Sequence, residues 1–163
     1  MKKLIYTFLI IIALANNSFS AGSNDDNNST SKVSDYSKAK NLIKAAKKYE
    51  KKGKIEKAQK RYAKAQKLLL KSNDKKPLQA DTLNYLGFTT RKLGDYEGGE
   101  EFYLQGLKIE PNHNGINEYL GELYVATNRM DMAKERLEVL KTCNCEEYGE
   151  LKEIIEGIKK SKY

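Results

Sequence analysis

The sequence predicts an all-α fold built from successive helix hairpins, and two observations carry that prediction. The 163 residues include two prolines and no tryptophan, and outside the N-terminus they lack the β-branched runs that favour strands. The pair Leu86-Gly87 recurs 34 residues later as Leu120-Gly121, and other small and aromatic positions recur at the same interval. A fixed period of this length is typical of helix pairs that stack into a solenoid.

The first twenty residues have the layout of a secretory signal peptide. Two lysines precede an apolar run from Leu4 to Ala15, and a site of small residues follows, at Ser18 and Ser20 before Ala21. A run of twelve apolar residues is short for a membrane span. We therefore expect residues 1–20 to be removed from an exported protein that is periplasmic or secreted; an uncleaved N-terminal anchor is the alternative.

Residues 21–37 are rich in asparagine, serine and aspartate and contain almost nothing that a core could bury. Segments of this composition do not gain enough from burial to offset the entropy of ordering the chain. The sequence predicts a disordered polar tether here.

Three consecutive segments carry the repeat, at residues 39–72, 80–113 and 114–145. The middle one is the most regular, with Leu83, Leu86, Gly87, the turn Gly94-Asp95-Tyr96, Gly99, Tyr103, Gly106 and Pro111. At these positions the chain resembles the tetratricopeptide repeat, a 34-residue helix hairpin. The resemblance implies a right-handed superhelical solenoid of three hairpins. Within it, the first helix of each hairpin lines a concave groove for extended peptides or partner helices.

Small residues recur on the second helix of each hairpin, at Gly99 and Gly106 in the middle repeat and at Ala58 and Ala65 in the first. An interior glycine weakens a helix by about 0.5 to 1 kcal/mol relative to alanine. We expect close helix packing to offset that cost. The segment 71–77 does not fit the period, and we expect it to be a loop.

Three residues depart from the repeat pattern, and an amphipathic segment follows the last repeat. Thr90 of the middle repeat replaces an aromatic residue, whereas in the last repeat Asn117 replaces a bulky residue and Leu140 occupies a normally small position. Within 146–163, four apolar residues follow a helical period: Leu151, Ile154, Ile155 and Ile158. We expect this segment to cap the end of the solenoid.

The groove predicted from the resemblance has a mixed lining, basic at one end and acidic at the other. On the side of the first helices that faces away from the second helices, where we expect no intramolecular neighbour, lie Lys40, Ile43, Lys47, Asn84, Phe88, Arg91, Glu118 and Glu122. An aromatic residue and an arginine at the centre of such a surface are the types that often dominate binding energy.

Charge is distributed unevenly along the repeats. Between residues 36 and 76, lysine and arginine outnumber aspartate and glutamate 16 to 3, whereas between 77 and 163 the balance is 11 to 16. The lysine-rich first hairpin fits an anionic polymer or membrane surface, but a charged helix face is often only a solvated one. Nucleic acid is not an expected partner of an exported chain.

Cys143 and Cys145 form the most unusual local motif. In an oxidising compartment we expect them to form a structural disulfide that fixes the turn before the capping segment; a Cu(I) site and free or intermolecular thiols are the alternatives. This pair followed by two acids and a final helix is similar to the end of small exported bacterial tetratricopeptide proteins.

No set of residues suggests catalysis. The single histidine, His113, lies in a turn between repeats without a partner motif, and we expect a surface or capping role. We predict a non-enzymatic protein without a cofactor, an adaptor that binds a protein or peptide in the bacterial envelope. The alternatives are an electrostatic binder of anionic polymer or lipid through the first hairpin, and a thiol- or metal-handling factor.

Overall fold

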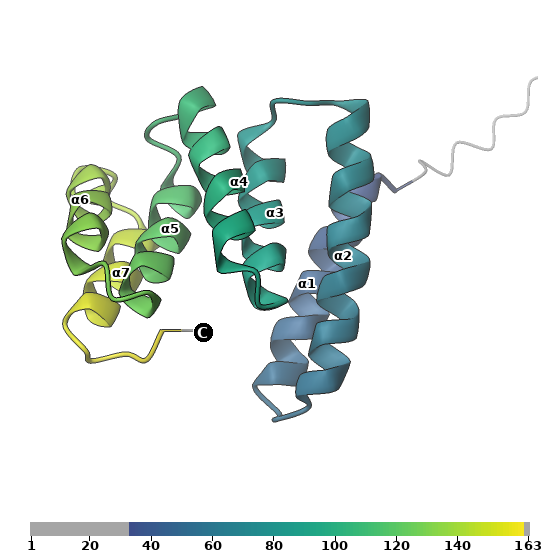
Figure 1. The fold of residues 1–163 in the computed structure, drawn as a ribbon, viewed down its shortest axis with the longest axis horizontal. Helices are drawn as coiled ribbons and strands as arrows, with labels where there is room; N and C mark the ends of the chain where they lie inside the picture. The colour runs from purple at the N-terminus through teal and green to yellow at the C-terminus, as the bar shows by residue number, and fades with distance from the viewer. Residues whose placement is uncertain (1–32, 162–163) are drawn as a thin grey trace, which may run out of the picture. The chain divides into compact units, whose positions relative to one another are not determined.

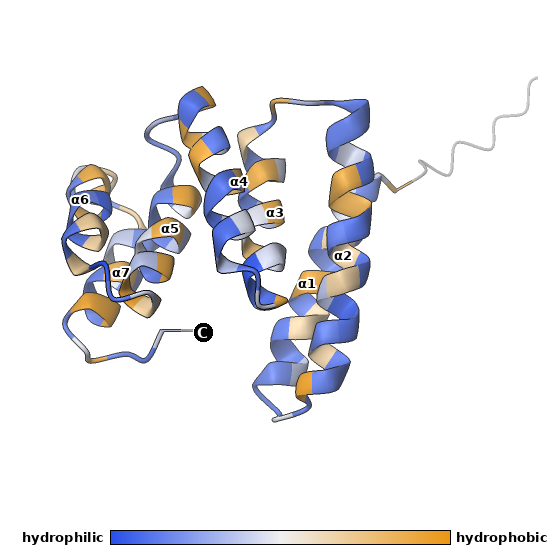
Figure 2. Ribbon diagram, viewed as in Figure 1, coloured by the Kyte–Doolittle hydropathy of each residue, from blue (hydrophilic) through white to orange (hydrophobic). Residues whose placement is uncertain are grey.

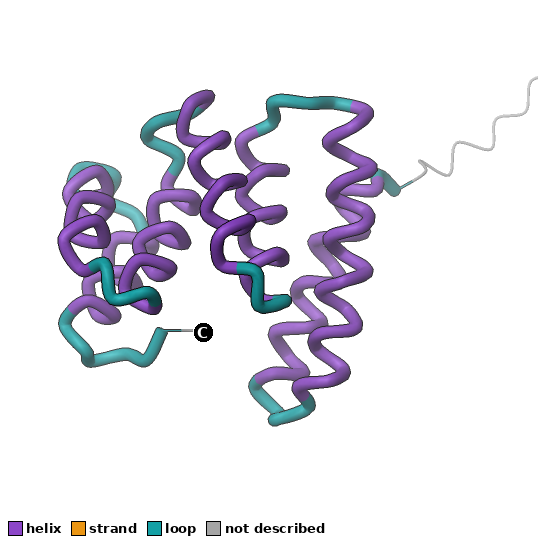
Figure 3. The backbone as a smooth tube through the Cα atoms, in the orientation of Figure 1, coloured by secondary structure: helices purple, strands orange, loops and turns teal. Residues whose placement is uncertain are grey.

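The computed structural model describes residues 33–161, which form an array of seven helices without a strand (Figures 1 and 3). In chain order these are α1 (Asp35–Glu50), α2 (Ile55–Lys75), α3 (Ala80–Lys92), α4 (Tyr96–Ile109), α5 (Asn114–Ala126), α6 (Met130–Leu140) and α7 (Glu146–Ile155). The predicted signal peptide and residues 21–32 of the predicted tether lie outside the described residues. No described helix has the length and apolar character that a membrane span requires.

The helices pack as three successive hairpins, α1 with α2, α3 with α4 and α5 with α6, and α7 packs on α5 and α6. This is the all-α helical repeat array predicted from the 34-residue period. Two buried clusters run through it. One joins the first hairpin to α3, and the other joins α4, α5 and α6 around Tyr103 and Leu120.

The first helix begins earlier than the sequence predicts. Ser34 caps α1, since its Oγ accepts a hydrogen bond from the Ser37 backbone N–H at 3.1 Å. Asp35 adds a favourable charge to the first turn and accepts a hydrogen bond from Lys75 Nζ at 2.7 Å. The predicted tether therefore ends before Asp35, and its extension to residue 37 is wrong.

The second helix runs on through most of the predicted loop. α2 has 21 residues and continues to Lys75, so only residues 76–79 connect it to α3. Leu69 is fully buried, and Lys71 and Lys75 both approach Asp35. These contacts with α1 support the additional residues 71–75, roughly one and a half turns of helix, and the expectation of a loop at 71–77 is wrong for those residues.

Close helix approach at the small positions is confirmed. A Cβ at Gly99 would lie 3.0 Å from the Gly87 carbonyl oxygen, and a Cβ at Gly106 would collide with Ile116 Cδ1. The first repeat's Ala58 and Ala65 are fully buried. The cost of these glycines in helix propensity is thus offset by contact that a side chain would prevent.

The departures from the repeat pattern have local hydrogen-bonding roles. Asn117 is fully buried and donates through Nδ2 to the carbonyl oxygens of Pro111 and His113, at 3.0 and 3.1 Å. His113 caps α5, because its Nδ1 accepts from the Ile116 N–H at 3.2 Å. The capping role expected for His113 is confirmed. Thr90 Oγ1 accepts from Gln66 Nε2 at 2.8 Å and so joins α3 to α2.

The capping helix is shorter than the apolar period predicts. Leu151 and Ile154 are buried, but α7 ends at Ile155 and Ile158 is 73% exposed. Gly157 adopts a φ of +73°, a left-handed conformation that terminates the helix and turns the chain. Ile158 is therefore not part of the apolar face, and in Figure 1 the segment after α7 runs back beneath α5.

Two glycine substitutions test this packing. Gly99→Ala should lower the free energy of unfolding by about 1 to 3 kcal/mol, because the new Cβ meets the Gly87 carbonyl and the Arg91 backbone. Gly149→Ala in α7 has open space around its Cβ and should raise the free energy of unfolding by about 0.5 to 1 kcal/mol. Urea denaturation measures both; equal shifts of the same sign would contradict the proposed close approach.

Candidate interaction groove

A groove of about 650 Å³ opens between the first hairpin, α3 and the C-terminal segment. We call it the inner groove. Side chains from α1, α3, α7 and the residues that follow α7 line it: Lys47, Glu50, Lys51, Phe88, Lys92, Glu150 and Lys159. Because these elements are far apart in the sequence, the inner groove exists only when the array is assembled.

Phe88 lies at the base of the inner groove, and two tyrosine rings pack against it. The rings of Phe88 and Tyr119 lie 5.1 Å apart, and the Tyr62 ring meets Phe88 edge-on at 5.7 Å. Lys47 Nζ lies 4.5 Å from the centre of the Phe88 ring and donates a hydrogen bond to the Tyr119 hydroxyl at 3.2 Å. Burial raises the pKa of Tyr119 above the ordinary value for tyrosine.

Carboxylates hold two of the lysines at the rim. Glu50 accepts a hydrogen bond from the Tyr62 hydroxyl at 2.8 Å and pairs with Lys92 Nζ at 2.6 Å. On the opposite side, Lys159 Nζ pairs with Glu150 at 2.5 Å. Four lysines and two glutamates thus surround the groove, which gives it a net positive rim around an aromatic base.

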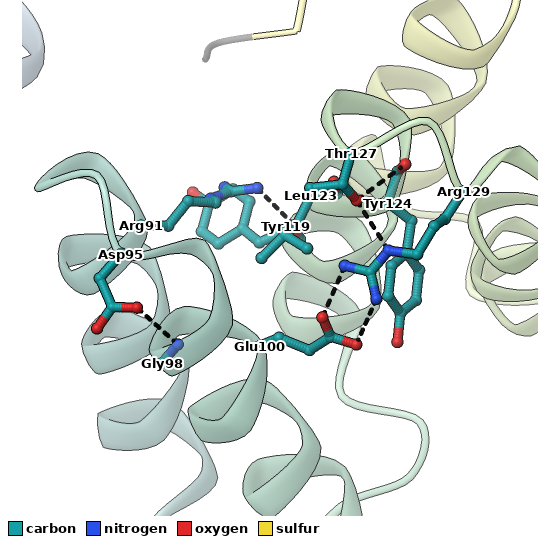
Figure 4. A network of polar contacts seen from close by, with 9 residues as sticks. All are labelled: Arg91, Asp95, Gly98, Glu100, Tyr119, Leu123, Tyr124, Thr127 and Arg129. Carbon is teal, nitrogen blue, oxygen red and sulfur yellow. Dashed lines mark hydrogen bonds and ion pairs between the residues drawn. The ribbon is translucent and has the colours of Figure 1, made fainter.

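A polar belt connects neighbouring helices (Figure 4). Arg91 Nη1 donates to the Tyr119 carbonyl oxygen at 2.7 Å, and Arg91 Nη2 lies 3.7 Å from Glu122, with both side chains fully buried. Nearby, Arg129 makes a bidentate pair with Glu100 at 2.9 and 2.6 Å. The contacts of Arg91 join α3 to α5, and those of Arg129 join the loop after α5 to α4.

The eight residues predicted to line the groove lie at different depths. Lys40 is exposed and Lys47 is half-buried. The other six are buried: Ile43, Asn84, Phe88, Arg91, Glu118 and Glu122. The expectation that no intramolecular neighbour covers this face is therefore wrong for these six, whereas their role in partner binding stays a prediction.

Their neighbours explain this burial. Ile43 belongs to the core of the first hairpin, and Phe88 packs between two tyrosine rings. The structure brings Lys47 together with Phe88, and Arg91 together with Glu122. Asn84 and Glu118 line a separate shallow hollow beside Tyr119.

Five rim residues were absent from the predicted lining: Glu50, Lys51, Lys92, Glu150 and Lys159. Lys51 follows Lys40 and Lys47 at helical spacing, so the sequence contained the signal for it. Lys159 reaches the groove only because Gly157 turns the chain after α7, which the periodicity of an amphipathic helix does not predict.

The two cysteines lie away from the inner groove, between α6 and α7. A disulfide joins Cys143 to Cys145, whose Cα atoms are 5.1 Å apart, in agreement with the expected structural bond. Among the described residues there is no cluster of three or more histidine, cysteine, aspartate or glutamate side chains that could hold a metal ion.

Comparison with known proteins identifies the repeat. Residues 80–113, which include α3 and α4, match the tetratricopeptide repeat family. The first TPR of Spaghetti (RPAP3) bound to the HSP90 peptide SRMEEVD is similar in structure, with 22% identity, a TM-score of 0.48, and coverage of 77% of this chain and 97% of that chain. The CopN-Scc3 complex gives 20% identity, a TM-score of 0.49, and coverage of 75% and 69%. No curated protein matches the chain.

The buried position of Phe88 yields a stability prediction. Phe88→Ala should lower the free energy of unfolding by about 3 to 5 kcal/mol, because it removes a ring that is 1% exposed and packs between two others. Ile158→Ala, at a side chain that is 73% exposed, should change it by less than about 0.5 kcal/mol. Thermal and urea denaturation distinguish these outcomes, and an unchanged midpoint for Phe88→Ala would show that the ring is not part of the core.

Proposed function

We propose that this chain, a tetratricopeptide-repeat protein, is an exported and non-enzymatic interaction module that holds a partner peptide or helix in the inner groove. Stacked helical repeats create extended concave surfaces, and this is the general way in which such arrays bind other proteins. The proposal covers an adaptor role in the cell envelope of a bacterium.

The inner groove itself carries the proposal. The alkyl stems of its lysines, above the buried Phe88 ring, offer apolar contact, while the charged ends of the lysines and glutamates of the rim offer hydrogen bonds that fix the orientation of a bound segment. The residues pointing into it come from three different helices and the C-terminal segment, which is an arrangement suited to recognition.

A catalytic role has less support. The single histidine is used as a helix cap, and the two cysteines are joined to each other. The thiol or metal-handling alternative would need additional ligands near the cysteine pair, which the described residues do not supply.

Site-specific photocrosslinking tests the groove. A photoreactive residue in place of Lys51, at the rim, should crosslink one partner protein in cells that produce the chain naturally. The same residue in place of Glu101, which is exposed on α4, should not. An identical set of products from both positions would contradict binding in the inner groove.

Charge variants add a matched control to this experiment. Lys40 and Lys44 lie within two turns of Lys47 on α1, whereas Lys108 and Lys134 are exposed on α4 and α6 and do not line the inner groove. Reversal of the first pair to glutamate should reduce the crosslink roughly tenfold, because charge complementarity sets approach and register at an interface. Reversal of the second pair should leave it unchanged; an equal loss with both pairs would indicate a response to net charge alone.

Export is tested by the mass of the protein. We expect the chain recovered from the envelope or the medium to begin at Ala21, because small residues around Ser20 suit signal-peptide cleavage. Intact-mass spectrometry of the natural protein decides it. A mass that still includes residues 1–20 would identify an N-terminally anchored protein instead.

A further inference from the structure

A row of lysines runs along the outer side of α2. Its members follow one another at intervals of three and four residues, which places them on one face of the helix: Lys57, Lys60, Lys64, Lys67 and Lys71. All five are exposed. The buried residues of α2 lie on the other side of the helix and pack against α1 and α3: Ala58, Tyr62, Ala65 and Leu69. We call this feature the lysine row.

Four of the five lysines in the row form no ion pair with another described residue. Within the described part of the chain, Asp35 is the acid that pairs with the row, through Lys71 at 3.9 Å, beside the stronger contact from Lys75. The two acids of α2, Glu56 and Asp74, lie near its ends. The terminal helix of a solenoid needs a polar outer face for solubility, and a mixture of acidic and basic side chains provides it. A row of five lysines is therefore more positive than solubility requires.

The shape of the lysine row favours a broad partner. The first and last lysines are 14 positions apart, which corresponds to roughly 21 Å along a helix. The row stands on the exposed side of a helix, so its charges face outward together. This arrangement suits many weak contacts with a surface of dispersed negative charge.

Exposed apolar side chains accompany the lysine row. Leu70 is 44% exposed and lies one helical turn from Lys67. Val33 is 53% exposed and precedes α1 by two residues, at the end of the row where Asp35 meets Lys71 and Lys75. Apolar groups beside cationic ones are what an interfacial helix inserts below the headgroups of a lipid layer.

From these observations we propose that the lysine row docks the protein onto an anionic phospholipid surface. Figure 2 shows that hydrophilic residues dominate α2, with apolar residues between them. The docking surface is separate from the inner groove, so a partner held there and a membrane bound through α2 do not compete. The membrane contact is electrostatic, with Leu70 and Val33 adding shallow apolar insertion.

Vesicle cosedimentation tests the proposal with residues 21–163. This segment contains the compact unit 33–163 and both of its buried clusters, and circular dichroism verifies that each variant is helical. The probes are vesicles of phosphatidylcholine alone and vesicles with about one third phosphatidylglycerol. We expect binding to the anionic vesicles only, and its loss as salt rises from about 0.05 to about 0.5 M.

Two variants with the same net charge separate a docking surface from general basicity. The first replaces four members of the row by glutamine: Lys57, Lys60, Lys64 and Lys67. The control replaces four exposed lysines elsewhere by glutamine: Lys108, Lys134, Lys141 and Lys160. We expect the first variant to bind anionic vesicles at least about tenfold more weakly and the control to stay within about twofold, since charge near the lipid surface decides the affinity.

Three results would overturn the proposal. Equal losses in the two variants would mean that net charge, and not the lysine row, drives binding. Equal binding to neutral vesicles would exclude an electrostatic contact. Binding to a soluble polyanion such as polyphosphate without binding to anionic vesicles would assign the row to a polymer instead. None of these readouts depends on a partner in the inner groove, so failure here leaves the proposed function untouched.

Discussion

The close approach of α3 and α4 is the constraint on which the arrangement of the array depends. A Cβ on Gly87 would collide with the Tyr103 ring of α4, and a Cβ on Gly99 would lie 3.0 Å from the Gly87 carbonyl oxygen and 3.3 Å from the Arg91 backbone nitrogen. With the two helices at this distance, Tyr103 is fully buried and joins the cluster that continues into α5. Gly121 repeats the arrangement by admitting Leu151 of α7, so the same device connects the last hairpin to its cap.

This packing also explains why the inner side of the array is polar and yet buried. Arg91 extends from α3 toward α5, where it meets the Tyr119 carbonyl and Glu122. Removing one member of a buried ion pair lowers the stability of the fold much more than removing one member of an exposed pair. The reason is that the remaining charge stays buried without an opposite charge beside it. The belt therefore fixes the register of the second hairpin on the third, and it leaves Lys47, Phe88 and the rim lysines to define the inner groove.

The sequence predicted the repeat units, the capping helix and the cysteine bond because each depends on local period or spacing. It did not predict the length of α2, since the contacts of Lys71 and Lys75 with Asp35 involve residues that are distant in the chain. Gly98, next to Gly99, does not belong to the small positions that recur with the repeat. In the structure Asp95 caps α4 by accepting from the Gly98 N–H at 2.8 Å, and a Cβ at Gly98 would collide with that carboxylate. The burial of Phe88 and Arg91 was also missed, because helical periodicity assigns a face but not the residues that cover it.

The inner groove and the lysine row differ in how their charges are balanced, and this difference separates their functions. At the rim of the groove, Lys92 and Lys159 already pair with Glu50 and Glu150, so a bound segment must exchange one ion pair for another. Such an exchange contributes little net binding energy. It favours a partner whose charges match the existing pattern of lysines and glutamates. On α2, by contrast, four consecutive members of the row meet no carboxylate within the described residues. A contact between one of these lysines and an anion adds binding energy without breaking an existing ion pair. Such contacts attract any dense negative surface and give little selectivity. In the roles that we propose, selective recognition is therefore assigned to the inner groove and membrane attachment to the face of α2.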